Sequence, residues 1–216
     1  PHSTFDHSLR TLENALDSSK NRIKHFIYFS SSMVYGNFSS HQVNEKSVCE
    51  PLGIYGALKF SGEKMVIAYN QVFDLPYTII RPSALYGERC ISRRVGQIFI
   101  ENALFKKNIK INEDGSEKLD FTYIKDLVNG IICIIKNKNS KNEIFNLTYG
   151  EAKPISKLVE ILSDYFPNIE VEKVPKDVLM PERGTLSNDK IKNLLGFESR
   201  WPLEKGYRQY IEWYKN

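Results

Sequence analysis

Short apolar runs alternate with amphipathic helical patterns from one end of the chain to the other, and this alternation limits the fold more than any other feature. The runs His25–Ser30 and Tyr77–Arg81 are rich in aromatic and β-branched residues, which is typical of buried parallel strands. Between them, the apolar positions of Tyr55–Phe73 follow a helical period and predict one long helix. Strands that alternate with helices predict an α/β fold with a doubly wound parallel sheet, whose ligands bind at the carboxyl ends of the strands.

The remainder of the chain continues this alternation with shorter elements. Strands are predicted at Leu119–Ile124 and Glu143–Thr148, and helices at Val95–Phe105, Lys125–Lys136, Asp189–Leu195 and Leu203–Tyr214. Pro154 is expected in the first turn of a further helix, where proline is tolerated, and Lys136–Asn142 is expected to be a solvated loop. We therefore assign residues 1–87 to the sheet domain and residues 88–216 mainly to a small C-terminal α/β lobe, with segments near 119–148 returning to the sheet.

Charge and cysteine content argue against several classes of partner. The 30 basic and 26 acidic residues are scattered along the chain, so the net charge of +4 does not indicate a nucleic acid. Cys49, Cys90 and Cys133 are an odd number without CxxC spacing, so we expect no disulfide framework, no metal site and a reducing compartment. No window approaches the roughly 18 uninterrupted apolar residues of a membrane span. These features predict a cytoplasmic protein with no membrane partner.

One helix could carry an acid–base pair. Tyr55 and Lys59 lie one turn apart on the same face, and an ammonium there favours the phenolate, which makes the tyrosine a usable general base. Chance supplies about one such pair in a lysine-rich chain with 12 tyrosines, and a second pair does occur at Tyr149 and Lys153. That second pair spans a glycine and stops against Pro154, so we expect it to lie in a turn.

Several short motifs follow one another along the chain, and their order is more specific than any one of them. They are Ser30-Ser31-Ser32, Val34-Tyr35-Gly36, Tyr55-Gly56-Ala57-Leu58-Lys59, Arg81-Pro82, Leu85-Tyr86-Gly87, Asp120-Phe121, Arg183-Gly184 and Leu195-Gly196-Phe197. This set resembles the extended short-chain dehydrogenase/reductases, in particular the NAD-dependent epimerases and dehydratases of nucleotide sugars. The resemblance covers nearly the whole chain. It implies a Rossmann-like sheet, of which residues 1–87 would be the remaining NAD-binding part.

The resemblance assigns roles to individual residues. Ser31 would hydrogen-bond the reacting sugar hydroxyl, Tyr55 would transfer its proton, and Lys59 would support Tyr55 and contact the nicotinamide ribose. Pro82 and Ser83 would lie beside the nicotinamide. Ser30, expected to be packed, is counted with the cofactor-binding residues, and Ser32 with the substrate-binding residues.

The implied reaction is inversion of a hexose carbon, with C4 expected, by passing a hydride to NAD and back through a keto-sugar. Related dehydratases carry an acidic pair where this chain has Ser32 and Met33, so inversion is favoured over loss of water. The epimerising reductases of the family place a histidine where this chain has Glu88 and Arg89. NAD is expected rather than NADP, and a UDP- or dTDP-hexose used in polysaccharide biosynthesis is the expected substrate.

The chain departs from the family pattern at the site expected for the substrate diphosphate. Leu119 and Ala84 stand where family members commonly have arginine and asparagine. Arg93, Arg94 and Arg183 could supply the missing donors, since guanidinium groups bind phosphate in a bidentate manner. The alternative, in which Arg93 and Arg94 are a solvated pair at the start of a helix, stays open.

The larger departure is the absence of a GxxGxxG turn, the usual pyrophosphate site, among the 12 glycines. The chain begins at Pro1 inside a helical pattern, so we expect an N-terminal truncation, weak or absent NAD binding and an unpaired sheet edge. A homodimer packed through Tyr55–Phe73 is expected from the family. Three alternatives remain: a dehydratase, a keto-sugar reductase, and a catalytically silent module that binds NAD or a nucleotide sugar. Retention of Ser31, Tyr55 and Lys59 favours an enzyme over the silent module.

Overall fold

A parallel sheet forms the centre of the fold in the computed structural model, which describes residues 2–38, 40–176 and 180–216. Its strands are β1 (Phe26–Phe29), β3 (Tyr77–Arg81) and β8 (Glu143–Asn146), in the order β1-β3-β8. Both pairings are parallel, with Phe29 opposite Ile80 and Arg81 opposite Asn146. The carboxyl ends of all three strands therefore meet at one edge, as the alternating pattern predicts. Within the described residues, β1 is an outer strand of this sheet.

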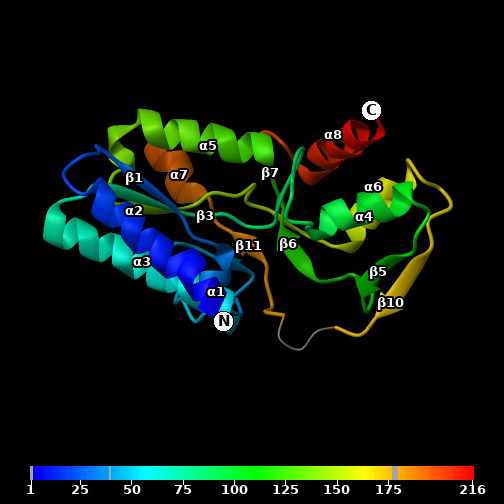
Figure 1. The fold of residues 1–216 in the computed structure, drawn as a ribbon. Helices are drawn as coiled ribbons and strands as arrows, with labels where there is room; N and C mark the ends of the chain where they lie inside the picture. Colours follow the sequence, from blue (N-terminus) through cyan, green and yellow to red (C-terminus); the bar gives the residue numbers. More distant parts are fainter. Residues whose placement is uncertain (1, 39, 177–179) are drawn as a thin grey trace.

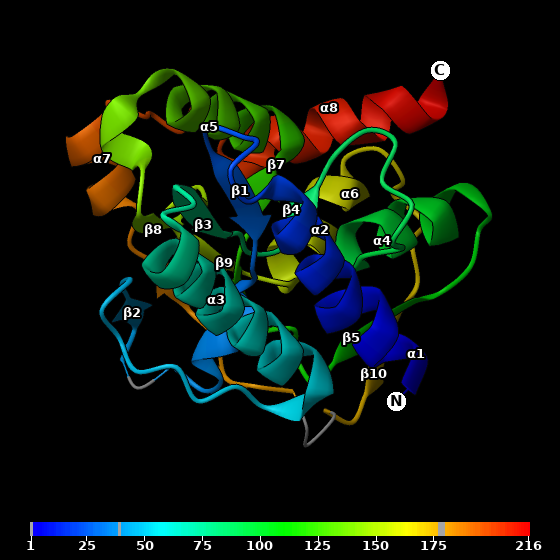
Figure 2. The same ribbon diagram turned by 60° about the vertical axis from the view of Figure 1, so that its left-hand side comes forward.

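Helices cover both faces of the sheet (Figure 1). Figure 2 shows α2 (Thr11–Ser19) and α3 (Gly53–Phe73) in front of it, and α5 (Ile124–Lys136) and α7 (Asp189–Leu195) cover the opposite face. Successive residues of β3 enter different cores: Ile79 packs in the cluster with α2 and α3, and Ile80 in the cluster with α5 and α7. Coverage on both faces explains why every residue of β3 is buried, and it confirms the doubly wound parallel sheet.

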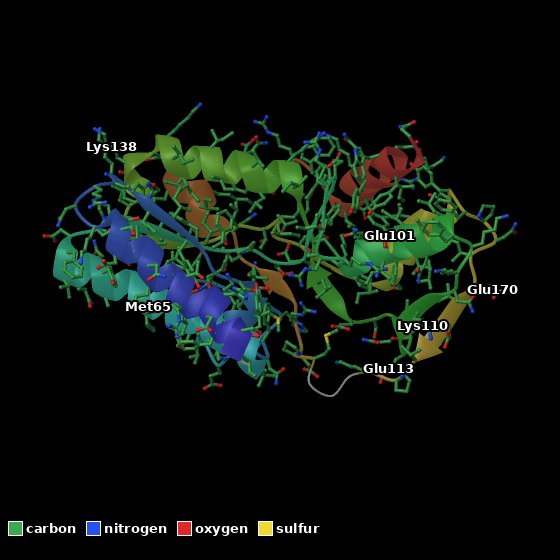
Figure 3. The ribbon with its side chains drawn as sticks, viewed as in Figure 1. Met65, Glu101, Lys110, Glu113, Lys138 and Glu170 are labelled. Carbon is green, nitrogen blue, oxygen red and sulfur yellow. The ribbon has the colours of Figure 1, made fainter. Side chains whose placement is uncertain are left out.

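A second core lies beside the sheet, where the C-terminal half of the chain folds around aromatic side chains. Its helices are α4 (Val95–Leu104), α6 (Ser156–Ser163) and α8 (Leu203–Lys215). Strand β5 (Ile109–Asn112) pairs in parallel with β10 (Val171–Val174), and Figure 3 marks this end of the molecule by Lys110, Glu113 and Glu170. Fully buried side chains of this core include Ile100, Ile109, Tyr207, Tyr210 and Ile211.

Short strand pairs connect the two cores. Strand β2 (Gln42–Val43) pairs with β11 (Thr185–Leu186), and β4 (Leu85–Tyr86) pairs with β7 (Thr122–Tyr123), both in parallel. Strand β6 (Lys118–Asp120) pairs antiparallel with β9 (Ala152–Pro154). The remaining elements are α1 (His2–Phe5), a π-helical turn at Asp6–Arg10, and 3₁₀ turns η2 (Ser32–Tyr35) and η3 (Lys138–Ser140). No helix in the described ranges is long and apolar enough to cross a bilayer.

Three local predictions were wrong. The strand expected at Leu119–Ile124 is divided into β6 and β7, because its first part pairs with β9 and its second part with β4. Pro154 ends strand β9, and the helix begins only at Ser156; a proline without an N–H group is compatible with a strand end. In Lys136–Asn142, Ser140 is fully buried, and its hydroxyl donates to the Ile134 carbonyl at 2.7 Å.

Candidate active site

A pocket of about 480 Å³ lies where the carboxyl ends of β1 and β3 face the C-terminal half of the chain. On the sheet side it is lined by the segment after β1, the first turn of α3 and the segment after β3. On the other side it is lined by parts of α4, β5 and α6. Its polar lining residues include Ser30, Ser31, Ser32, Tyr55, Ser83, Tyr86, Arg94, Lys110, Asn112, Glu117 and Arg183. This volume lies in the range of small-molecule sites.

The predicted acid–base residues meet at the sheet side of this pocket. Ser31 and Tyr55 both line it, although they come from the end of β1 and the start of α3. Ser31 begins the η2 turn, and its Oγ accepts a hydrogen bond from the Met33 amide at 3.1 Å. The hydroxyl proton is therefore still available to donate to a ligand. The tyrosine ring is 46% exposed, so its phenol can reach a molecule in the pocket.

Lys59 stands behind Tyr55 and does not line the pocket. Its Nζ lies 5.9 Å from the centroid of the Tyr55 ring and donates to the Phe29 carbonyl at 2.8 Å. Burial lowers the pKa of this lysine. The structure thus brings Ser31, Tyr55 and Lys59 together. It separates the second Tyr-x-x-x-Lys pair from any helix, since Lys153 lies in β9 with its Nζ on Glu151.

The residues expected beside a nicotinamide also line the pocket. Pro82 and Ser83 follow β3, next to the segment that carries Ser31, and the Ser32 amide donates to the Pro82 carbonyl at 2.9 Å. Ser30 is packed as expected, because its Oγ donates to the Glu63 carboxylate at 2.5 Å. Its hydroxyl is therefore committed to the protein.

The opposite end of the pocket is basic. Arg94, Lys110 and Arg183 line it, together with the carboxylate of Glu117. The Nη2 of Arg183 makes only a long, 3.4 Å contact to Glu117, and its Nε is buried without a partner among the described residues. Burial lowers the pKa of Arg183, Glu117 opposes this shift, and the charge of Arg94 adds to it. A buried guanidinium with a free N–H group is a strong candidate for binding an anion.

The two adjacent arginines at the start of α4 point to different places. Arg94 lines the pocket, whereas the side chain of Arg93 is 67% exposed and pairs with Glu101 at 3.2 Å. The structure therefore brings Arg94, and not Arg93, to the basic end. Ser32, the other residue predicted on the substrate side, lines the pocket.

The sequence did not predict the structural roles of two buried acidic residues, Asp120 and Glu63. Asp120, fully buried, accepts hydrogen bonds from the Thr148 hydroxyl and from the Gly150 and Leu186 amides, so it joins β6 to β11 and to the segment after β8. Burial raises its pKa to about 6. Glu63 forms an ion pair with Arg81 at 2.6 Å, with both side chains buried.

The part of the chain that the structure describes contains no group of three or more histidine, cysteine, aspartate or glutamate side chains that could hold a metal ion. Cys49, Cys90 and Cys133 are free thiols.

Comparison with known proteins relates this chain to one family. Residues 1–148 match the family model described as the NAD dependent epimerase/dehydratase family. The chain is 31% identical over 159 residues to an uncharacterized UDP-glucose epimerase of Bacillus subtilis strain 168, covering 73% of this chain and 50% of that protein. It is 30% identical over 206 residues to a putative UDP-glucose 4-epimerase of Methanocaldococcus jannaschii, covering 88% of this chain and 63% of that one.

The fold is also similar to solved structures. A UDP-glucuronic acid 4-epimerase of Bacillus cereus, in complex with UDP-glucuronic acid and NAD, superposes with a TM-score of 0.88 at 27% identity, covering 94% of this chain and 66% of that one. A UDP-glucose 4-epimerase of Thermotoga maritima superposes with a TM-score of 0.85 at 26% identity, covering 94% and 66%. The chain therefore spans between half and two-thirds of the length of these relatives.

Proposed function

Because the chain belongs to the NAD-dependent epimerase/dehydratase family, we propose that it acts on a nucleotide sugar as an NAD-dependent epimerase that inverts C4 of the hexose. One observation carries this proposal: a serine–tyrosine pair and a partly unpaired buried arginine line the same pocket. The first could hold and deprotonate a sugar hydroxyl, and the second could bind the diphosphate of the same molecule. A homodimer packed through α3 and a cytoplasmic location stay predictions.

The pocket supports inversion over loss of water. Elimination needs an acid beside the departing hydroxyl. Among the described lining residues, the carboxylate is Glu117, and it lies with Arg183 at the basic end. Ser32 and Met33 occupy the place next to Ser31. A dehydratase or a keto-sugar reductase therefore remains an alternative with less support from the side chains that are present.

The residues on the sheet side fit the nicotinamide end of NAD. Pro82 offers an apolar surface, Ser83 a hydroxyl, and Lys59 an ammonium group beside Tyr55. The glycine-rich turn that would hold the pyrophosphate does not occur in this sequence. When bound, NAD supplies an acceptor that takes a hydride from the sugar carbon and returns it.

The chain's own residues would transfer the proton of the sugar hydroxyl. Ser31 would donate its hydroxyl hydrogen to the sugar oxygen and orient it toward Tyr55, whose phenolate takes the hydroxyl proton as the carbonyl forms. Lys59, held by the Phe29 carbonyl, would stabilise the phenolate without contacting the sugar carbon. The keto-sugar then rotates in the pocket and presents its other face. The same groups return the proton in this second half of the reaction.

Proton NMR of the sugar ring tests this function. The chain is incubated with NAD and UDP-glucuronic acid or UDP-glucose, and a second set of ring signals from the C4-inverted sugar is expected while NAD stays oxidised. A 4-keto-6-deoxy product would indicate a dehydratase. Stoichiometric reduction of NAD as the sugar is oxidised, which is the reverse of a keto-sugar reduction, would indicate a reductase. Binding of UDP without any product at saturating NAD would favour the silent module.

Replacing Arg183 with glutamine is expected to weaken UDP binding by roughly 10- to 100-fold, because a charge-assisted bond to phosphate contributes about 1.5–3 kcal/mol. Isothermal titration calorimetry measures the change. Arg93→Gln serves as the comparison, since Arg93 points away from the pocket and pairs with Glu101. The UDP affinity of this variant is expected to stay within about twofold of the original. Equal losses in the two variants would mean that long-range charge, and not contact with Arg183, binds the diphosphate.

A further inference from the structure

One buried carboxylate, that of Glu63 in α3, links the three elements that carry the candidate catalytic and nicotinamide-side residues. Its side chain is 1% exposed and does not line the pocket. It accepts hydrogen bonds from Ser30 Oγ at 2.5 Å, from Arg81 Nε at 2.9 Å and from Arg81 Nη2 at 2.6 Å. Ser30 directly precedes Ser31, and Arg81 directly precedes Pro82. Glu63 therefore binds the residue immediately before Ser31 and the residue immediately before Pro82.

Two successive turns of α3 hold two successive residues of the first catalytic segment. Lys59 donates to the carbonyl of Phe29, and Glu63, one turn later, accepts from the side chain of Ser30. Gly62 brings the helix close to β1, because a Cβ atom there would lie 2.2 Å from the Tyr28 hydroxyl. The distance between α3 and the end of β1 is thus defined by direct contacts.

Arg81 extends this linkage across the sheet. Its Nη1 donates to the Tyr35 hydroxyl at 3.0 Å, and that hydroxyl donates to Asn146 Oδ1 at 2.7 Å. Burial disfavours the charge of Arg81, but the hydrogen bonds to Glu63 and the surrounding groups raise its pKa overall. A buried ion pair gives little net stability, because desolvation offsets the attraction. Its contribution here is geometric: the planar, bidentate contact of Arg81 fixes the end of β3 on α3, and the Ser30 contact to the same carboxylate fixes the end of β1.

We propose that Glu63 is a positioning residue, which fixes Ser31 relative to Tyr55 and Lys59 through Ser30 and Arg81 without contacting the substrate. This rests on the proposed function. Loss of the carboxylate leaves every pocket side chain in the sequence but frees the end of β1 to move relative to α3. A displacement of about 1 Å can reduce a rate about 10²-fold. The basic end of the pocket, which would bind the diphosphate, does not depend on this contact.

Two variants test this role in the full chain: Glu63→Gln, which removes the charge at nearly constant volume, and Ser30→Ala, which keeps the Glu63–Arg81 pair and removes its link to β1. Both are expected to lower kcat by roughly 30-fold or more and to leave KM and UDP affinity within about threefold. Asp126→Asn is the matched control. Asp126, in α5, is an equally buried carboxylate that accepts from the Arg200 and Trp201 amides and does not line the pocket.

Amide hydrogen exchange gives a second readout that does not depend on catalysis. The Ser30 and Ser32 amides donate to the Ile80 and Pro82 carbonyls, at 2.8 and 2.9 Å. Both are expected to exchange about tenfold faster or more in Glu63→Gln, and to be unchanged in Asp126→Asn, as local loosening requires. Glu63 has no positioning role if its variant loses no more kcat than Asp126→Asn, or if the two amides exchange at the original rate. If the original chain inverts no nucleotide sugar, the proposed function fails, and amide exchange still decides whether Glu63 fixes the strand ends.

Discussion

The Tyr55→Phe variant is expected to lose about 10³-fold in kcat for inversion of a nucleotide sugar, with KM within about threefold of the original. The substitution removes one hydroxyl group from a ring that lines the pocket. It leaves Ser31 and the Lys59–Phe29 contact in place. Binding groups therefore remain, and the proton that leaves the sugar hydroxyl has no acceptor. Such proton transfer contributes roughly 10²- to 10⁴-fold to the rate of a typical enzyme.

Tyr149→Phe is the matched control for this variant. Tyr149 has the same spacing to a lysine, but Lys153 lies in β9 with its Nζ on Glu151, and neither residue lines the pocket. Its kcat is expected to stay within about twofold of the original. Both variants are assayed by proton NMR at saturating NAD. A Tyr55→Phe enzyme that keeps more than a tenth of the original kcat would show that another group takes the proton.

The sequence was most informative where a local pattern alone decides the structure. Strand β3 has the predicted bounds, Tyr77–Arg81, because a strand covered on both faces is mainly apolar and aromatic, and this one ends where the chain meets Pro82. The rule that ligands lie at the carboxyl ends of parallel strands brought Ser31 and Ser83 to the same edge, and the structure places both in the pocket.

Features that depend on partners far away in the sequence could not be predicted. The charge of Glu63 reads as a solvated helix position until the fold places Arg81, 18 residues later, against it. Asp120 belongs to a recognisable motif, yet its function as an acceptor for two separate segments, the one after β8 and β11, follows only from the tertiary structure. Arg93 and Arg94 have the same sequence context, and only their backbone directions distinguish them; Arg93 has a positive φ of 45°. The assignment of binding roles to Arg94 and Arg183 stays a proposal.

Gly36→Ala is expected to destabilise the fold by about 3–4 kcal/mol, the largest effect on stability that we predict. Gly36 follows the η2 turn, which contributes Ser32 and Met33 to the pocket, and it has a φ of 65°. Its ψ of −134° places it outside the left-handed helical region, in a conformation that costs a side chain about 1–3 kcal/mol. In addition, a Cβ atom at Gly36 would lie 1.9 Å from the Glu50 carbonyl oxygen, a backbone atom that cannot rotate away. Overpacking of this kind adds about 1–3 kcal/mol.

Gly196→Ala is the reference for a glycine with positive φ that has room for a side chain. Gly196 ends α7 in the left-handed helical region, with a φ of 69° and a ψ of 23°, and a Cβ atom there would meet nothing within 4 Å. It should therefore lose only the conformational part, about 1 kcal/mol. Urea unfolding followed by circular dichroism measures both variants, and the midpoint should fall at an unchanged slope. Glu50 lies just before α3, the helix that carries Tyr55. The additional loss of stability expected for Gly36→Ala therefore measures how tightly the η2 turn packs against the segment that leads into α3. Equal losses in the two variants would show that the segment at Glu50 moves to accommodate the added methyl group.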